Sequence, residues 1–177
     1  NIATCGGGGC SVTDDERLGK LSKHLTTTAK QPHAWHFVHD EVAFNYRMPN
    51  INAALGCAQL ELLPAMLADK RATAAAYNQF CAEHGLTFCA ERPGTSANYW
   101  LNTLLLESES QLDAFLHYAN EQGVMSRPAW RLMSNLPAFR ASERGPLPNA
   151  EWLAARIVNL PSGVRDGFAH DAGLSHA

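Results

Sequence analysis

Apolar residues in the first half of the chain recur mostly at the three- and four-residue spacing of helices. The residues TDDE at 13–16 begin the first such stretch, because Thr13 can cap a helix and the acids suit the positive end of its dipole. We expect that helix to run to about Leu25. The spacing returns over 51–62, and Pro64 can begin a further helix that ends at Gly85.

Shorter and more varied segments follow residue 85. Strands are predicted at 86–88, 99–106 and 124–127, and helices at 110–123 and 151–157. The stretch 99–106 is apolar on both faces, which is typical of a central strand. The order strand, helix, strand predicts a small α/β domain in the second half of the chain.

A run of four glycines at 6–9 separates two short strand candidates, 2–5 and 10–12. Glycines allow positive φ and a close approach of the backbone to other atoms. A hairpin turn between the two strands is the favoured interpretation. The alternative is a ligand that passes against bare backbone. The run matches neither the phosphate-loop pattern nor the dinucleotide-binding pattern.

The long segment 26–44 is irregular and rich in histidine and aromatic residues, and long loops in compact domains are often functional. His33, His36 and His39 recur at every third position, which raises the alternative of zinc. We favour a loop that covers a pocket or a subunit contact, because this spacing suits a helix poorly and zinc requires fixed tetrahedral ligands. No metal site is predicted.

The segment VAFNYRMPNINAALG at 42–56 joins this loop to the next predicted helix. One guanidinium and three amides crowd the helix start, those of Arg47, Asn45, Asn50 and Asn52. A helix start carries unpaired backbone N–H groups and the positive end of the helix dipole. The junction is therefore suited to an anion such as a phosphate.

Composition narrows the class of protein. A 177-residue chain that is 46% hydrophobic can form a packed core. The net charge of −3 gives no electrostatic reason to expect binding to nucleic acid or to an anionic membrane. No uninterrupted apolar run approaches the roughly 20 residues of a membrane span, and no signal peptide is recognised. Five cysteines without a C-x-x-C pair predict reduced thiols in the cytoplasm, with Cys57 and Cys81 in the core.

Residues 42–56 resemble the segment G-[FY]-N-Y-R-M-x-[ND]-[IL]-[NQ]-A-A-[LI]-G of the DegT/DnrJ/EryC1/StrS sugar aminotransferases. Those enzymes use pyridoxal 5'-phosphate (PLP) and have the aspartate aminotransferase fold, fold type I. The resemblance implies an α/β chain from the C-terminal part of such an enzyme. Residues 1–63 would end the large PLP-binding domain, 64–162 would form a linking helix and a small α/β domain, and 163–177 a loose tail.

The resemblance also implies site residues. In the family a Schiff-base lysine precedes the glycines, in a pattern like N-K-I-[IV]-T-[TS]-G-G-G-G. This chain has Asn1 at that position, or beside it if one residue is missing after Asn1. An asparagine amide cannot form the Schiff base, so no catalytic residue is identified in this chain.

The family's cofactor and substrate contacts map onto positions that are present. Asn45 matches an asparagine that reaches the cofactor phosphate of a neighbouring subunit, and Arg47 would lie nearby. The segment SRPAW at 126–130 resembles G-[IV]-x-[ST]-R-P-x-W of a branch that makes 4-amino sugars for nonulosonic acids and surface glycans. The substrate-binding candidates are Trp35, His36, Tyr46, Arg127 and Trp130. The residues alone leave open an Asn45 bonded to its own backbone, a salt-bridged Arg47 and a Trp130 in the core.

The function implied by the resemblance is amino transfer from glutamate to a keto-sugar on a nucleoside diphosphate, by a homodimer with shared active sites. Three alternatives are a relative without the lysine that binds PLP or a sugar nucleotide, a dehydratase with His in place of Lys, and a purely structural fragment. Asn1 does not favour the dehydratase.

Overall fold

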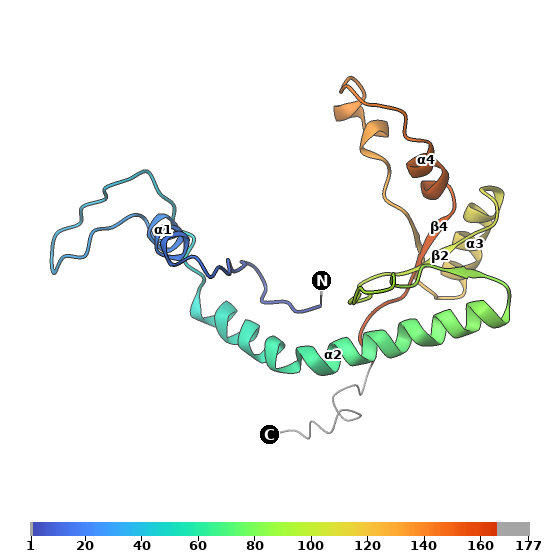
Figure 1. Ribbon diagram of the computed structural model, residues 1–177, viewed down its shortest axis with the longest axis horizontal. Coiled ribbons are helices and arrows are strands. Elements are labelled where there is room, and N and C mark those ends of the chain that lie inside the picture. The colour runs from blue at the N-terminus through green and yellow to red at the C-terminus, as the bar shows by residue number, and fades with distance from the viewer. Residues whose placement is uncertain (1, 166–177) are drawn as a thin grey trace. The chain divides into compact units, whose positions relative to one another are not determined.

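The computed structural model describes residues 2–165 (Figure 1). The chain divides into two compact units after Leu63. Among the described residues, 3–63 form unit 1, and Ile2 together with 64–165 forms unit 2. The predicted α/β class is confirmed, since helices and a β-sheet are both present.

Unit 1 begins with an extended segment and helix α1, Glu16–Thr26. Asp15, and not Thr13 as predicted, caps this helix: its carboxylate accepts from the backbone N–H groups of Arg17 at 2.8 Å and Leu18 at 3.1 Å. The Thr13 hydroxyl instead accepts from the N–H of Asp15 at 3.1 Å. The cap moves because Asp15 has the extended backbone conformation that a cap requires.

The strands predicted at 2–5 and 10–12 are wrong, since neither segment forms a strand. The backbone of the first segment bonds to helical side chains instead. Thr4 donates its N–H to Oε1 of Gln59 at 3.3 Å, and Nδ2 of Asn52 donates to the Cys5 carbonyl at 2.6 Å. These side-chain contacts replace the sheet ladder that the apolar alternation suggested.

Residues 26–46 form a long loop shaped like a hairpin, which we call the hairpin loop. A few backbone hydrogen bonds hold its two arms together. Its two arms are joined by bonds from Thr28 N to Phe44 O at 3.0 Å and from Gln31 N to Val38 O at 2.8 Å. At its base, His24 Nε2 lies 2.6 Å from Asp40 Oδ1, and this hydrogen bond lowers the pKa of Asp40. The loop is therefore tied to the end of α1.

Helix α2 is one continuous helix, Asn50–Glu83, and the predicted break before Pro64 is wrong. Proline removes one helical hydrogen bond, and the helix-forming residues around it carry the helix through. Among the described residues, α2 is the one helix long and apolar enough to cross a membrane by length and composition. The sequence of α2 contains polar residues at intervals, so it holds no uninterrupted apolar run of that length. Its buried charges bond to protein groups, Lys70 Nζ to the Ser162 carbonyl and Asp69 to Arg165.

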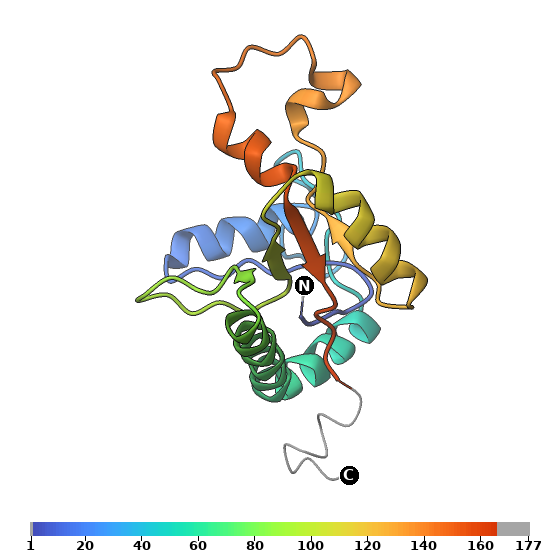
Figure 2. The same ribbon diagram turned by 90° about the vertical axis from the view of Figure 1, so that its right-hand side faces the viewer.

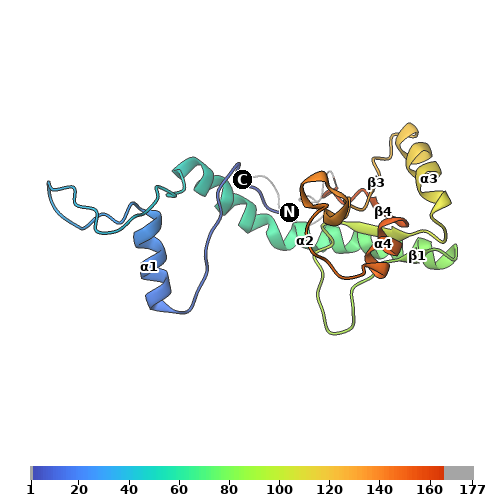
Figure 3. The same ribbon diagram turned by 90° about the horizontal axis from the view of Figure 1, so that it is seen from above.

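Unit 2 contains a four-stranded antiparallel sheet in the order β1-β2-β4-β3. Its elements are β1 Thr87–Phe88, β2 Asn102–Leu105, α3 Ser110–Glu121, β3 Arg127–Pro128, α4 Pro148–Ala154 and β4 Ile157–Leu160, with 3-10 turns at Met133–Asn135 and Pro137–Phe139. Helix α3 packs against β3 and β4 (Figures 2 and 3).

The sheet confirms a central β2 and corrects two predictions. Helix α4 ends at Ala154, so Ile157 begins a strand and does not end a helix. That strand, β4, lies between β2 and β3, which are therefore parallel to each other but not neighbours. The predicted strand 124–127 begins only at Arg127.

The hydrophobic core of unit 2 lies between α2, α3 and the sheet. Cys81, Leu104, Leu106 and Val158 are buried there, with partly buried neighbours Phe88, Leu112, Phe115, Leu116 and Leu160. Burial raises the pKa of the Cys81 thiol. The core position predicted for Cys57 is wrong, because Cys57 is exposed.

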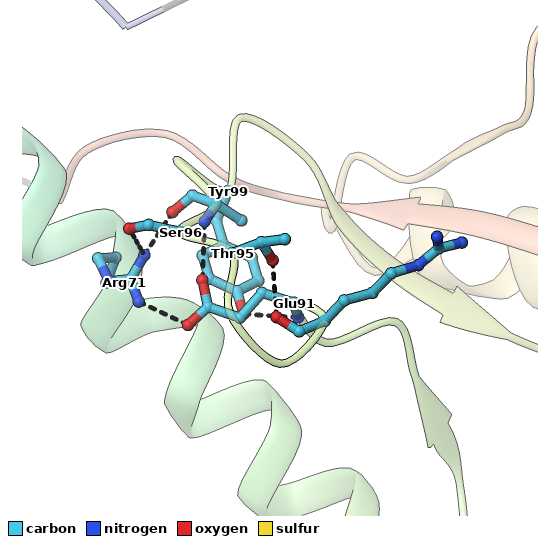
Figure 4. Close-up of polar contacts among 7 residues, drawn as sticks. Arg71, Glu91, Thr95, Ser96 and Tyr99 are labelled. Carbon is cyan, nitrogen blue, oxygen red and sulfur yellow. Dashed lines mark hydrogen bonds and ion pairs between the residues drawn. The ribbon is translucent and has the colours of Figure 1, made fainter.

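Arg71 of α2 fastens the loop between β1 and β2 (Figure 4). Its guanidinium donates to Glu91 Oε1 at 2.7 Å, to the Ala97 carbonyl at 2.6 Å and to Ser96 Oγ at 3.2 Å. The second oxygen of Glu91 accepts from the N–H of Ala97 at 2.7 Å. We call this cluster the Arg71 clamp. A planar guanidinium with several donors is well suited to hold a loop at several points.

The Arg71 clamp predicts a pH-dependent stability. The hydrogen bond from Arg71 lowers the pKa of Glu91 below its ordinary 4.5, so the ionised contact stabilises the fold above that pH and is lost as the pH falls through the lowered value. We expect Glu91→Gln to lower the urea midpoint at pH 7. The difference from wild type should shrink as the pH falls below about 4. A difference that stays constant between pH 7 and pH 3 would contradict the ionic contribution.

Candidate functional site

A pocket of about 900 Å³ lies within unit 1. Its walls come from the glycine run, α1, the end of the hairpin loop and the start of α2. The lining residues are Gly7, Gly8, Gly9, Cys10, Ser11, Thr13, Gly19, Ser22, Lys23, Thr26, Asn45, Tyr46, Arg47, Met48, Pro49 and Asn52. We call it the unit 1 pocket.

The unit 1 pocket has the chemistry of an anion site. Lys23 and Arg47 are the charged residues among its described lining, and that lining contains no aspartate or glutamate. Helix α2 begins beside them at Asn50, where first-turn N–H groups lack helical partners. The positive end of the helix dipole adds to the two cationic side chains. The site therefore favours a phosphate or a carboxylate.

The glycine run forms one wall of the pocket, close to the start of α2. Gly8 has a φ of +104°, and a Cβ there would lie 2.9 Å from Cε of Met48. A side chain at Gly8 would therefore be strained and would push on a pocket residue. The predicted turn between two strands is not formed, because the flanking strands are absent. Gly7, Gly8 and Gly9 instead present backbone to the pocket.

Three predicted site residues meet in this pocket. Asn45, Tyr46 and Arg47 all line it, and all three are exposed residues. The Asn45 amide makes no hydrogen bond to another described residue, and Arg47 has no carboxylate partner in that part of the chain. An Asn45 bonded to its own backbone and a salt-bridged Arg47 are therefore not observed among the described residues. Both side chains are available to a ligand.

The other predicted residues lie elsewhere. Trp35 and His36 are at the tip of the hairpin loop, where the His33 ring lies 5.0 Å from that of Trp35 and 4.4 Å from that of His36, and they do not line the unit 1 pocket. Arg127 and Trp130 belong to unit 2. Trp130 is 68% exposed, so it is not a core residue of that unit. Asn1 lies outside the described residues.

The histidines of the hairpin loop are engaged in local contacts. His33 Nδ1 accepts from the N–H of His36 at 3.0 Å, and His39 Nδ1 lies 2.6 Å from the Thr28 carbonyl. Within residues 2–165, no three His, Cys, Asp or Glu side chains are placed to hold a metal ion.

Lys23 and Ser22 of α1 are pocket residues that the sequence analysis missed. The available signal was the position of Lys23 in the last turn of the predicted helix. Helical spacing shows that Lys23 and Thr26 share a face, but it does not show that this face meets the glycine run. That contact depends on the path of residues 6–12, which were predicted to form a turn and a strand.

A family model and two curated relatives match most of this chain, and the family is one of aminotransferases. Residues 1–167 match the sequence model of the DegT/DnrJ/EryC1/StrS aminotransferase family. EpsN of Bacillus subtilis (strain 168) is 32% identical over 167 residues, which are 92% of this chain and 43% of EpsN. GDP-perosamine synthase of Vibrio cholerae is 33% identical over 127 residues, 70% of this chain and 35% of the synthase.

The fold is shared with solved structures. The PLP form of Spr1654 from Streptococcus pneumoniae aligns with a TM-score of 0.75 and 19% identity, over 92% of this chain and 43% of Spr1654. The chain therefore spans less than half the length of the relatives it matches. The fold is that of part of a fold type I enzyme, as predicted.

Proposed function

Because the chain belongs to the DegT/DnrJ/EryC1/StrS aminotransferase family, we propose that it is part of a PLP-dependent sugar aminotransferase. The proposed reaction moves an amino group from glutamate to a keto-sugar on a nucleoside diphosphate, in the cytoplasm, for a surface glycan or a nonulosonic acid. The observation that carries the proposal is the unit 1 pocket, where Asn45, Arg47 and the start of α2 offer donors to an anion.

These residues fit the phosphate end of PLP. A phosphate dianion needs several donors and no nearby carboxylate, and the described lining supplies both conditions. Asn45, Arg47 and Lys23 would hold it. When bound, PLP supplies the electron sink for amino transfer. The groups that would hold its ring and its aldehyde are expected in a preceding part of the protein, with the lysine at or beside Asn1.

We further propose a homodimer in which the hairpin loop and the unit 1 pocket, with its Asn45, serve the neighbouring subunit's cofactor. The hairpin loop exposes several large apolar side chains, Trp35, Phe37, Val38, Val42 and Phe44. Contiguous exposed apolar surface commonly marks a protein interface. Trp35, His36 and Tyr46 would then approach the substrate of the partner, while Arg127 and Trp130 would contact the sugar nucleotide.

A second candidate function is binding of PLP or a sugar nucleotide without amino transfer. Asn1 favours it if this residue stands at the family's lysine position and not beside it. Such a protein would keep the unit 1 pocket and lack the nucleophile.

The full-length protein, expressed with its encoded residues before Ile2, distinguishes the two functions. An aminotransferase with lysine there should absorb visible light with PLP, lose the absorption when glutamate is added, and lose it also when that lysine is replaced by alanine. The matched control is Lys20→Ala, an exposed lysine of α1 that does not line the unit 1 pocket. An encoded asparagine without visible PLP absorption would reject the enzyme.

A further inference from the structure

Two tryptophans of unit 2 that are far apart in the sequence lie face to face. The rings of Trp100 and Trp130 have centroids 5.9 Å apart and an interplanar angle of 27°. Both side chains are well exposed, 42% for Trp100 and 68% for Trp130. Tryptophan is usually largely buried, so an exposed stacked pair has an outer face available to another ring.

Trp100 is held firmly in this position. The two contacts that hold it are made by its backbone. Ser162 Oγ donates to the Trp100 backbone carbonyl at 2.5 Å, and the Trp100 backbone N–H donates to Oδ1 of Asn98 at 3.1 Å. The preceding residue, Tyr99, has a φ of +44°, a left-handed conformation that a bulky residue adopts only when its surroundings impose it. The Arg71 clamp supplies that constraint, since it fixes the loop through Ala97 and Glu91, and the Tyr99 hydroxyl accepts from the N–H of Glu91 at 3.1 Å (Figure 4).

Trp130 is presented just beyond β3, which pairs with β4. The same short stretch carries Arg127 and Arg131, and neither has a carboxylate partner among the described residues. Trp130 and Arg131 line a pocket of about 390 Å³ together with Glu151, and Trp100 lines a second pocket of about 520 Å³ together with Asn98. Each tryptophan of the stacked pair therefore lines a hollow of its own, and the stretch that carries Trp130 also carries the two arginines.

We propose that Trp100 and Trp130 form a stacking surface for the nucleobase of the nucleotide-linked substrate, with Arg127 and Arg131 toward its diphosphate. The inference rests on the proposed function and adds Trp100, which the sequence analysis did not select. An indole face accepts any flat aromatic ring, and an arginine fork matches phosphate oxygens. A ligand with a base at one end and a diphosphate beside it satisfies both features at once.

The test uses the full-length protein, with UDP and GDP as probes and calorimetry as the measurement. Trp100→Ala and Trp130→Ala should each weaken binding of the tighter of the two nucleotides about 10-fold or more. Trp100→Phe should stay close to wild type, because it keeps an aromatic face. The matched control is Trp152→Ala, an exposed tryptophan of α4 that lies under the Arg156 guanidinium and outside the pair.

A second readout separates binding from structure. The half-reaction with glutamate involves no nucleotide, so its rate should be unchanged in both tryptophan variants. A surface that merely packs against another part of the protein or a second copy would instead lower stability, the glutamate half-reaction and nucleotide binding together, and that result overturns the proposal. It is also overturned if wild type binds neither nucleotide, or if Trp152→Ala has the same effect. A protein that is not a PLP-dependent aminotransferase would give a different result. It would show no visible PLP absorption, while the nucleotide titrations would still measure the effect of the two tryptophan substitutions.

Discussion

Asn45→Asp in the full-length protein is expected to weaken PLP binding by well over 10-fold, and Asn45→Ala by about 10-fold. The Asn45 amide lines the unit 1 pocket, where it makes no hydrogen bond to another described residue. A hydrogen bond to a charged group contributes about 1.5–3 kcal/mol, which alanine would remove. Aspartate would also set a carboxylate against a phosphate dianion, so the two variants should be ordered, with aspartate the weaker binder.

Cofactor titration followed by absorbance measures both effects. Asn78→Ala is the matched control, because Asn78 is an exposed asparagine of α2 that lies outside the unit 1 pocket. Circular dichroism should show all three variants folded, since Asn45 is exposed and its side chain is not part of any hydrophobic core. Wild-type affinity in both Asn45 variants would make Asn45 an ordinary loop residue, and the phosphate would then depend on Arg47 and Lys23.

Mixed dimers would test whether Asn45 acts across subunits. An Asn45→Ala chain can be combined with a chain whose proposed lysine is replaced, so that each subunit carries one defect. If Asn45 serves the neighbouring cofactor, the site built on the chain that lacks the lysine carries both substitutions. The other site has an intact lysine and an intact Asn45, so the mixture regains activity. If Asn45 serves its own subunit, the chain that keeps the lysine has the weakened phosphate site, and no intact site forms.

Periodicity predicted the elements of this chain well where one face of an element is buried. Helix α3 was found because its Leu112 and Phe115 face the core of unit 2. It failed where the deciding contact is distant in the sequence. Cys5 bonds through its carbonyl to Asn52, and β4 is inserted between β2 and β3, and neither pairing has a local signal.

The candidate site shows the same limit. The anion-binding character of residues 45–52 followed from a helix start, amides and one arginine close together in the sequence. Lys23 and the face of the glycine run are brought there by the fold, as Trp100 is brought to Trp130 by the loop that Arg71 holds. The chemical character of each side chain could be predicted from the sequence. Which side chains lie next to one another in space could not, because that depends on the topology of the fold.

Leu104→Ala is expected to lower the free energy of unfolding by about 3 kcal/mol. Leu104 is 3% exposed and lies at the centre of the sheet, opposite Phe88 on β1 and Val158 on β4. Its loss would leave a cavity between two strands and the buried Cys81. Urea unfolding followed by circular dichroism measures the change.

Leu105→Ala is the matched control for this core position. Leu105 is the next residue of β2, so its side chain points to the opposite face, and it is only partly buried. The same atoms are removed, but water or flexible neighbours can fill part of the space, so the loss should be about 1 kcal/mol. Equal losses in the two variants would mean that the second face of the sheet is as well packed as the first, which would place a covering layer outside the described residues. A larger loss at Leu104 supports a one-sided sheet whose core is shared with α2 and α3.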